Sequence, residues 1–407
     1  MGKDWCMMSA AGIICEYNPF HEGHQFHIGQ VREKTGADTV VALMNGDFVQ
    51  RGEPAIVDKY IRTRMALEGG ADMVFELPVR YGLSSAEDFA RGGILALDSL
   101  SFIDFYCFGS EGALQEQLEL AGRYLAEEPE LYKRQLGCYL REGFSFPAAR
   151  ERAYADCVEL SQEERAQLFM PNNTLGIEYI KSAWQLGSPM KPVAIKREGM
   201  GYHEELTGQQ ERQGFLSATA VRSQIWKGNF AGLSEGAVEL LKKAHCFLCS
   251  EDFWQMCSFA IRDRWDRLED IKDLSGELAN SFRKNWYEAV SLDDFANHCK
   301  TKNMTMARIK RCVFQTLLEI EKESGGEDSL PYIRLLGMRR RAAVNLKRVK
   351  KTKVLGRLAR DMEELDKKGQ DKLFQDIKAA DLYRTVAMAV SGQRLPEEFR
   401  QPVILVD

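Results

Sequence analysis

Short apolar runs alternate with longer amphipathic stretches along the first half of the chain. The runs with the length and composition of buried strands are 11–15, 39–44, 73–75, 105–108 and 192–196. The stretches with helical periodicity between them lie around 25–34, 59–68, 86–97 and 114–125. Strands and helices in this order predict right-handed crossovers and a parallel sheet covered by helices on both faces. The pattern therefore predicts a Rossmann-like α/β fold.

From residue 234 onward the pattern changes, because strand-like runs fade and helix-forming residues dominate. We expect helices at 235–243, 291–299, 306–322 and 357–367. Ser291 and Asp294 form a variant of the capping box at the start of the second of these. At 407 residues the chain exceeds the size at which a single core stops growing. We therefore divide it into residues 1–233, which would hold the sheet, and residues 234–407, a mainly α-helical region.

Polar residues and glycines follow several of the predicted strands directly. Ligands of parallel α/β sheets bind at the carboxyl ends of the strands, where such residues would gather. The segments concerned are 16–18, 45–53, 76–78 and 109–111. Gly46 or Gly52 alone would simply indicate a turn. Their coincidence with polar residues at successive strand ends favours a nucleotide site.

Three of the six histidines lie within seven residues, after the first predicted strand: His21, His24 and His27. Backbone N–H groups and the dipole at a helix start favour anions, and a spacing of three places the rings roughly on one helical face. We expect His21 and His24 to bind phosphate, with Gly23 leaving room for a flat base. One alternative is a metal site formed by all three imidazoles. Another is that His27 has no ligand at all.

Phosphate-binding histidines would serve nucleotidyl or adenylyl transfer, in which an acceptor oxygen attacks the α-phosphorus and pyrophosphate leaves. The protein's work in such a reaction is to position the groups and neutralise charge on the phosphate oxygens. That work requires a second phosphate clamp. Lys196 and Arg197 lie at the end of the last predicted strand, and Ser217, Thr219 and Arg222 form a hydroxyl-rich helix start that exposes N–H groups.

Charge is unevenly distributed along the chain. The net charge of −5 excludes binding of a polyanion by bulk charge, so any nucleic-acid site must be a local basic patch. Residues 334–360 contain eleven Lys or Arg and no Asp or Glu, and a smaller basic cluster occupies 300–311. We predict RNA contact by Arg308, Arg311, Arg339, Arg340, Arg341, Lys350 and Lys351. The alternative is a solvated helix face balanced by acidic residues elsewhere in the fold.

Other features narrow the class of protein. No apolar run approaches the roughly 20 residues that span a bilayer, and the first residues lack the apolar core of a secretory signal. Ten scattered cysteines fit free thiols in a reducing cytoplasm. Cys246 and Cys249 have a spacing that can chelate zinc, with Cys257 nearby, but their apolar surroundings favour a buried structural role. We expect a cytoplasmic protein with no resident metal and no membrane partner.

The His-x-Gly-His core followed by Ser-x-Thr-x-x-Arg resembles the nucleotidyltransferase branch of the superfamily that includes class I aminoacyl-tRNA synthetases. More closely, several segments are similar to the tRNA(Met) cytidine acetate ligases: EYNPFHEGH, NGDFVQRGEPAIVDK, MPNNTLGIEY, IKREGMGYH, SATAVR, TMARIKRCVF and PYIRLLGM. The resemblance implies an HxGH-type nucleotidyltransferase fold and a two-step reaction. ATP would activate acetate as acetyl-adenylate. The acetyl group would then pass to the exocyclic amine of the wobble cytidine of elongator tRNA(Met), giving N4-acetylcytidine.

The same resemblance assigns site residues. ATP, with Mg²⁺, would contact the segment Ile14, Cys15, Glu16, Tyr17, Asn18, Pro19, Phe20, His21, Glu22, Gly23, His24, Gln25, Phe26 and His27, and the isolated positions Gly109, Asn172 or Asn173, and Arg197. Asn173 is preferred weakly over Asn172. His21, His24 and Arg197 would be the catalytic groups. Tyr17, Phe20 and Phe48 are candidates for a small acetate pocket.

One departure from the family pattern leaves a role open. Asn45 and Asp47 stand where that pattern has a serine and an asparagine, so Asp47 either adds a negative charge or helps to hold Mg²⁺. Two other functions compete with the ligase. The first is a nucleotidyltransferase that acts on a small phosphorylated metabolite, and the second is a non-catalytic, nucleotide-dependent RNA-binding protein.

Overall fold

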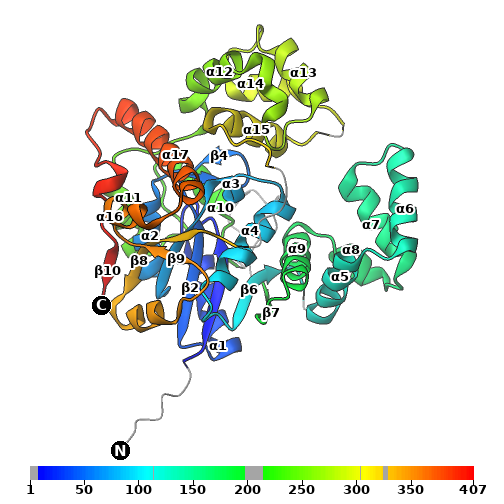
Figure 1. Ribbon diagram of the computed structural model, residues 1–407, viewed down its shortest axis with the longest axis horizontal. Coiled ribbons are helices and arrows are strands. Elements are labelled where there is room, and N and C mark those ends of the chain that lie inside the picture. Colours follow the sequence, from blue (N-terminus) through cyan, green and yellow to red (C-terminus); the bar gives the residue numbers. More distant parts are fainter. Residues whose placement is uncertain (1–7, 113, 198–213, 303, 324–328) are drawn as a thin grey trace, which may run out of the picture.

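A mostly parallel sheet with helices on both faces forms the centre of the protein (Figure 1). The computed structural model describes residues 8–112, 114–197, 214–302, 304–323 and 329–407. Within these residues the main sheet has eight strands in the order β10-β8-β5-β2-β1-β6-β7, with β9 paired to β8. A separate two-stranded ribbon, β3 (Phe48–Val49) and β4 (Glu53–Pro54), follows β2.

All the strands predicted for the first half of the chain are confirmed. They are β1 (Ala10–Cys15), β2 (Thr39–Asn45), β5 (Met73–Leu77), β6 (Phe105–Ser110) and β7 (Lys191–Lys196), and they pair in parallel. Every residue of β2 and β5 is buried, as a central strand covered on both faces requires. The expected Rossmann-like α/β fold is therefore present.

Helices pack against the two faces through alternate residues of the strands. Val41 and Leu43 of β2 face the core formed with α4 (Ala86–Ser99), α5 (Gln115–Glu127) and α9 (Pro171–Gln185). Val40, Ala42 and Met44 face the core formed with α1 (Glu22–Thr35) and α2 (Lys59–Glu68). This alternation is the period-two pattern of a strand with two buried faces. The carboxyl ends of the strands remain open for a site.

The region after residue 233 contributes strands that the sequence analysis did not predict. β8 (Tyr332–Arg339) pairs antiparallel to β5, and β9 (Lys353–Leu355) and β10 (Ile404–Val406) pair in parallel with β8. The expectation that strand signals fade was wrong here. Arg334 lies inside the β8 run, and its charge is neutralised by buried Glu76 and Glu398, which are distant in sequence. Strands from both sides of residue 233 thus share one sheet.

Most of the C-terminal region is helical, as predicted. Helices α11 (Glu235–Lys242), α14 (Leu292–Cys299) and α15 (Met306–Leu318) confirm three predictions. The expected helix at 357–367 was wrong, because only α16 (Leu358–Asp361) and a 3-10 turn, η4 (Met362–Glu364), form before the long helix α17 (Lys367–Ser391). Asp361 accepts the Gly356 and Arg357 N–H groups, and Asp366 caps α17. The chain therefore turns between α16 and α17 instead of forming one continuous helix.

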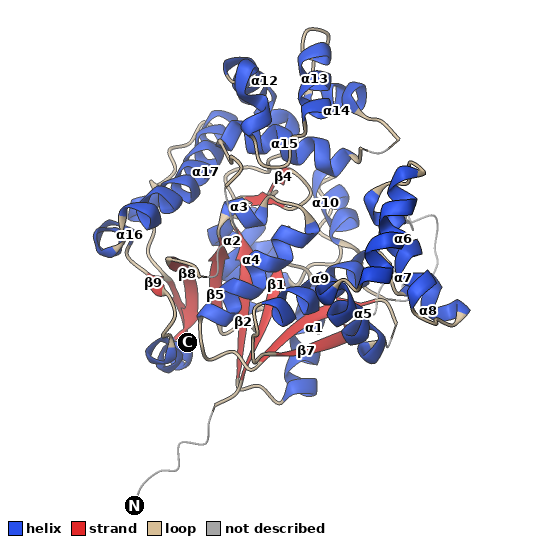
Figure 2. Ribbon diagram, turned by 45° about the vertical axis from the view of Figure 1, so that its right-hand side comes forward, coloured by secondary structure: helices blue, strands red, loops and turns tan. Residues whose placement is uncertain are grey.

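Two groups of helices extend beyond the sheet (Figures 1 and 2). One lobe lies above the carboxyl ends of the strands and shares a core with Phe48 of β3 and part of α17. It comprises η1 (Ser250–Phe253), α12 (Trp254–Asp263), η2 (Trp265–Asp270), α13 (Gly276–Asn285), α14 and α15. The other lies beyond α5 and α9 and comprises α6 (Glu130–Arg141), α7 (Phe146–Cys157) and α8 (Gln162–Gln167). The remaining elements are α3 (Val79–Gly82), α10 (Ala218–Trp226), η3 (Arg340–Arg348) and η5 (Glu398–Arg400). No helix in the described part of the chain is long and apolar enough to cross a membrane.

Candidate active site

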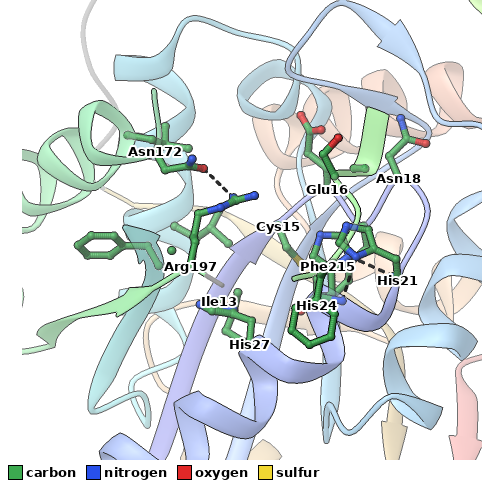
Figure 3. Close-up of a pocket in the computed structure, with 18 of the residues that line it drawn as sticks. Ile13, Cys15, Glu16, Asn18, His21, His24, His27, Asn172, Arg197 and Phe215 are labelled. Carbon is green, nitrogen blue, oxygen red and sulfur yellow. Dashed lines mark hydrogen bonds between the residues drawn. The ribbon is translucent and has the colours of Figure 1, made fainter. Parts of the chain in front are cut away.

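A cavity of about 320 Å³ lies at the carboxyl ends of β1, β6 and β7 (Figure 3). Its volume lies at the lower end of the roughly 300–1,000 Å³ range of small-molecule sites. The end of β1, the start of α1 and the start of α10 all contribute to its lining. This is the edge of the sheet where the sequence predicts a ligand.

His21 and His24 form a stacked pair at the entrance to α1. His21 is the N-cap residue, and its Nδ1 accepts the Gly23 N–H at 3.1 Å, while Nδ1 of His24 accepts the His21 N–H at 3.3 Å. The ring centroids are 3.7 Å apart. Because both Nδ1 atoms are acceptors, each neutral ring carries its proton on Nε2. His21 therefore precedes the helix instead of sharing its face, and the pair offers two N–H donors.

The packing of the histidine pair requires glycine at position 23. A Cβ at position 23 would lie 2.9 Å from Cε1 of His21 and 3.2 Å from Cβ of Phe215. A side chain at position 23 would therefore displace His21 or Phe215, while Gly23 itself lines the cavity, so the expectation that a flat base lies against it stays a prediction. Phe215, which the sequence analysis missed, lines the cavity beside the histidines.

All three histidines are uncharged near neutral pH. Burial, with the charges of Arg197 and Arg222 nearby, lowers the pKa of His21 to about 4. Burial also lowers the pKa of His27 to about 4 and that of His24 well below its usual value. Neutral imidazoles bind phosphate as hydrogen-bond donors, so the positive charge must come from arginines. Nε2 of His27 has no hydrogen-bond partner within the described residues and lines the same cavity.

The His21 shift predicts a pH dependence of stability. Its pKa is about 4 in the fold and 6.5 in the reference state, so unfolded chains bind more protons below pH 6.5. The contribution of His21 is therefore present above pH 6.5 and lost as the pH falls towards 4. Between pH 7 and 4 the wild type should lose about 3 kcal/mol more free energy of unfolding than His21→Asn, which keeps a capping acceptor. Urea unfolding at both pH values measures this, and equal losses would contradict it.

Arg197 and Asn172 face each other on the β6–β7 side of the cavity. Arg197 directly follows β7, and its Nη1 donates to Oδ1 of Asn172 at 3.0 Å (Figure 3). A Cβ at Gly109 would lie 3.1 Å from Cγ of Arg197, so the arginine stem passes close over this glycine. Asn173 is fully buried instead, bonded to Ser110, Glu111 and Gln167. Of the two asparagines, Asn172 is therefore the one that lines the cavity.

The second predicted clamp lines the same cavity. Ser217 caps α10 by accepting the Ala220 N–H at 3.2 Å. Thr219 Oγ1 accepts from Arg51 at 3.3 Å and from Arg222 at 3.4 Å, and Arg222 also donates to the Asn18 carbonyl at 2.8 Å. The segment thus brings its hydroxyl groups, a helix N-terminus and the Arg222 guanidinium group to the cavity, where Arg51 joins them from the turn between β3 and β4. Arg51 and the neighbouring Gln50 were named only as part of a loop in the sequence analysis.

Some predicted contacts lie outside the cavity. Pro19, Phe20, Glu22, Gln25 and Asn173 are not in its lining. Phe48 packs against Phe253 and Phe314 in the core of the helical lobe, so it does not form an acetate pocket. Asp47 does not line the cavity either, because its Oδ1 accepts the Lys59 N–H at 2.8 Å inside the fold. The later part of the IKREGMGYH motif, residues 198–203, lies outside the described residues.

The apolar part of the lining was missed. It comes from Ile13, Phe89, Phe108, Leu175, Tyr179, Ile195 and Leu216. These residues belong to predicted or observed strands and helices, where an apolar side chain indicates core packing as readily as a ligand contact. A ligand contact can be told from core packing only once the fold shows which strands and helices meet at the edge of the sheet that holds the cavity.

The predicted RNA contacts fall into two groups, one on α15 in the helical lobe and the other in the segment 339–351 at and after the end of β8. Arg308 and Arg311 lie on α15, and a Cβ at Gly52 would come 2.3 Å from the Arg311 nitrogen, so α15 packs against the loop that carries Gln50 and Arg51. Arg339 is the last residue of β8, and its N–H donates to the carbonyl of Asp72, which directly precedes β5. Arg340 and Arg341 form ion pairs with Asp407 and Asp72, and Lys351 pairs with Asp98. These last residues and the exposed Lys350 lie away from the cavity.

No metal centre is evident in the part of the chain that the structure describes, where no three His, Cys, Asp or Glu side chains gather suitably. Cys257 is buried in the core of the helical lobe, and the Cys246 thiol donates to the Ala387 carbonyl. His21 and His24 each use Nδ1 as an acceptor from the backbone, which leaves Nε2 of each facing the cavity as a donor.

Comparison with known proteins agrees with this geometry. A model of the HIGH Nucleotidyl Transferase family matches residues 8–398. A tRNA(Met) cytidine acetate ligase of Thermoanaerobacter pseudethanolicus is 37% identical over 387 residues, covering 92% of this chain and 95% of its own. One of Clostridium perfringens is 36% identical over 390 residues, with the same coverage. Two crystal structures of Thermotoga maritima TmcAL, one with α-thio ATP and one apo, are 31% and 32% identical, with TM-scores of 0.86 and 0.89. Each covers 98% of this chain and all of its own.

Proposed function

Since the chain belongs to the HIGH nucleotidyl transferase family and, within it, to the tRNA(Met) cytidine acetate ligases, we propose that it is an ATP-dependent ligase that forms N4-acetylcytidine. The enzyme activates acetate as acetyl-adenylate and transfers the acetyl group to the wobble cytidine of elongator tRNA(Met). The observation that carries the proposal is one cavity in which the stacked His21–His24 pair faces Arg197 and Arg222.

In the first step the acetate carboxylate attacks the α-phosphorus of ATP and pyrophosphate leaves. Acetate is ionised at neutral pH and needs no general base. The Nε2–H groups of His21 and His24 bind the phosphate chain, while Arg197 and Arg222 supply the positive charge that the neutral imidazoles lack. The N-termini of α1 and α10 add N–H donors and favourable dipoles. The nucleoside lies towards Gly109 and Asn172, on the β6–β7 side.

Mg²⁺ would reach the cavity bound to the triphosphate of ATP. Mg²⁺ usually keeps several waters and is held largely by substrate phosphates, which suits a cavity whose described lining is rich in hydrogen-bond donors and poor in carboxylates. Asp47 faces Lys59 and Arg62 instead. The ion would supply charge neutralisation at the phosphates, and the protein's own residues position the chain.

Acetate-dependent exchange of labelled pyrophosphate into ATP is the direct test of the activity. We expect exchange with acetate and only background without it, and mass analysis of tRNA(Met) should show one added acetyl group. A folded protein without acetate-dependent exchange would contradict the proposal. A small-molecule nucleotidyltransferase would release a dinucleotide-like product without RNA, and an RNA-binding protein would bind both partners with no turnover.

We further propose that tRNA reaches the cavity past α15. Arg308 lies three residues before Arg311, which donates to the Gln50 carbonyl in the cavity loop. Replacing Arg308 by Gln should raise the KM for tRNA about five-fold and lower the slope of log K against log salt by about one, because one phosphate contact is lost. Acetate-dependent exchange should be unchanged.

The matched comparison is the double variant Arg340→Gln/Lys350→Gln, which removes two exposed charges in the segment 339–351. It should change the KM for tRNA less than Arg308→Gln does. The reverse order would place the RNA on the 339–351 segment, the other of the two basic clusters that the sequence predicts to bind it.

A further inference from the structure

Glu16 is the one carboxylate in the described lining of the cavity. It directly follows β1, and its Oε1 accepts the Gln50 N–H at 3.0 Å. Within the described residues Oε2 makes no hydrogen bond, and it is not among the buried polar atoms that are sealed from solvent. A carboxylate oxygen is therefore available inside a site whose other polar groups are donors for an anionic nucleotide.

The position of Glu16 separates it from the nucleotide side of the cavity. Gly109, Asn172 and Arg197 come from β6, α9 and the end of β7, on one side of β1. Gln50, which holds Glu16, belongs to the loop after β2, on the other side. Figure 3 shows Glu16 apart from the Arg197–Asn172 pair and on the side of Asn18. With phosphates over His21 and His24, the acyl acceptor approaches from the Glu16 side.

Two arginines offset the effect of burial on the pKa of the Glu16 carboxylate. Burial raises the pKa of Glu16, while the nearby charges of Arg51 and Arg222 oppose the rise. Arg222 is itself fixed by the Asn18 carbonyl and lies 4.0 Å from Glu53. Burial therefore makes Glu16 a stronger base than an exposed glutamate, while the two guanidinium groups favour its ionised form.

We propose, resting on the function proposed above, that Glu16 is the catalytic base of acetyl transfer: its Oε2 accepts a hydrogen bond from the exocyclic N4 amine of the cytidine and takes one proton from it. Acidic side chains commonly accept from N4 of cytosine, so the same contact selects the base.

The atoms balance in this step. N4 attacks the carbonyl carbon of acetyl-adenylate, the C–N bond forms, and the bond between that carbon and the AMP phosphate oxygen breaks. AMP leaves with the electron pair of that bond. The proton lost by N4 passes to Glu16 and then to water. The N4 lone pair is delocalised into the ring, so attack requires a base as the new bond forms.

The variant Glu16→Gln tests this assignment. Its amide oxygen can still accept the Gln50 N–H, so the loop stays anchored, but it cannot take a proton. Enzyme loaded with acetyl-adenylate is mixed with tRNA(Met), and the single-turnover rate of N4-acetylcytidine formation is measured. We expect the rate to fall about 10²–10⁴-fold, the usual contribution of a general base. Acetate-dependent exchange should fall less than about threefold, since the first step needs no base.

Two further variants make the result specific. Glu16→Asp keeps a carboxylate and should transfer acetyl at least about tenfold faster than Glu16→Gln. Glu53→Gln removes a neighbouring carboxylate outside the lining and should change neither step. Equal loss in Glu53→Gln would assign the effect to the general field around Arg222 and overturn the proposal.

The remaining outcomes are also decisive. Unchanged acetyl transfer by Glu16→Gln overturns the proposal, and so does an equal loss of exchange and transfer, which would indicate a contact with ATP or its metal ion. Absence of acetate-dependent exchange in the wild type would instead overturn the proposed function, so the two failures are distinguishable.

Discussion

Replacing His24 by asparagine should lower acetate-dependent pyrophosphate exchange about 10²–10³-fold, the usual cost of removing one hydrogen bond to charge that develops in a transition state. The asparagine oxygen can occupy the place of Nδ1 and accept the His21 N–H, so the helix start is preserved. The Nε2–H donor is lost. Because His24 is neutral, the loss measures a directed hydrogen bond and not a missing charge.

His24→Gln is the matched control, since its amide can place an N–H near the position of Nε2. It should recover part of the activity that His24→Asn loses. Binding of tRNA(Met), measured by filter retention, should be the same for both variants and the wild type. Equal exchange activity of His24→Asn and the wild type would contradict the phosphate role of His24.

The parallel half of the fold could be predicted because its signals are local. Each strand is a short apolar run, and several helices begin at a capping side chain, as in α2, where Asp58 accepts the N–H groups of Tyr60 and Ile61. The His-x-Gly-His segment and Arg197 could be placed in one site for the same reason, since both directly follow strands whose carboxyl ends share an edge.

What could not be predicted depends on partners far away in sequence. Arg341 looks like a free basic residue of an RNA-binding segment until Asp72, 269 residues earlier, is placed beside it. Arg334 argues against a buried strand until Glu76 and Glu398 neutralise it. The choice between Asn172 and Asn173 likewise depends on Ser110 and Glu111, which occupy the amide of Asn173.

The strongest of these long-range links is a buried ionic network that joins the C-terminal region to the sheet. Nζ of Lys59, on α2, lies 2.7 Å from Glu76 of β5 and also pairs with Glu398. Arg334 of β8 pairs with the same two carboxylates, and its Nη2 donates to the Tyr60 hydroxyl at 2.5 Å. Burial alone would raise the pKa of Glu398, but Lys59 and Arg334 lower it to about 2.

The network also borders the groups that shape the active site. Arg62, one turn after Lys59 on α2, donates to the carbonyls of Glu16, at 2.8 Å, and of Asn45, at 3.1 Å. These two residues lie at the carboxyl ends of β1 and β2. Loosening α2 would therefore disturb the base proposed for acetyl transfer as well as the fold.

Replacing Lys59 by methionine should destabilise the protein by about 3–5 kcal/mol, because breaking a buried pair leaves uncompensated charge. Lys59 is 1% exposed, and its removal would leave Glu76 and Glu398 sharing Arg334. The midpoint of urea unfolding at pH 7 measures the change. Lys351→Met is the matched control, since it breaks an ion pair of 2.6 Å with Asp98 on a half-exposed side chain. That variant should lose less than about 1 kcal/mol. Similar midpoints for the two variants would mean that the buried network does not hold the C-terminal strands to the catalytic sheet.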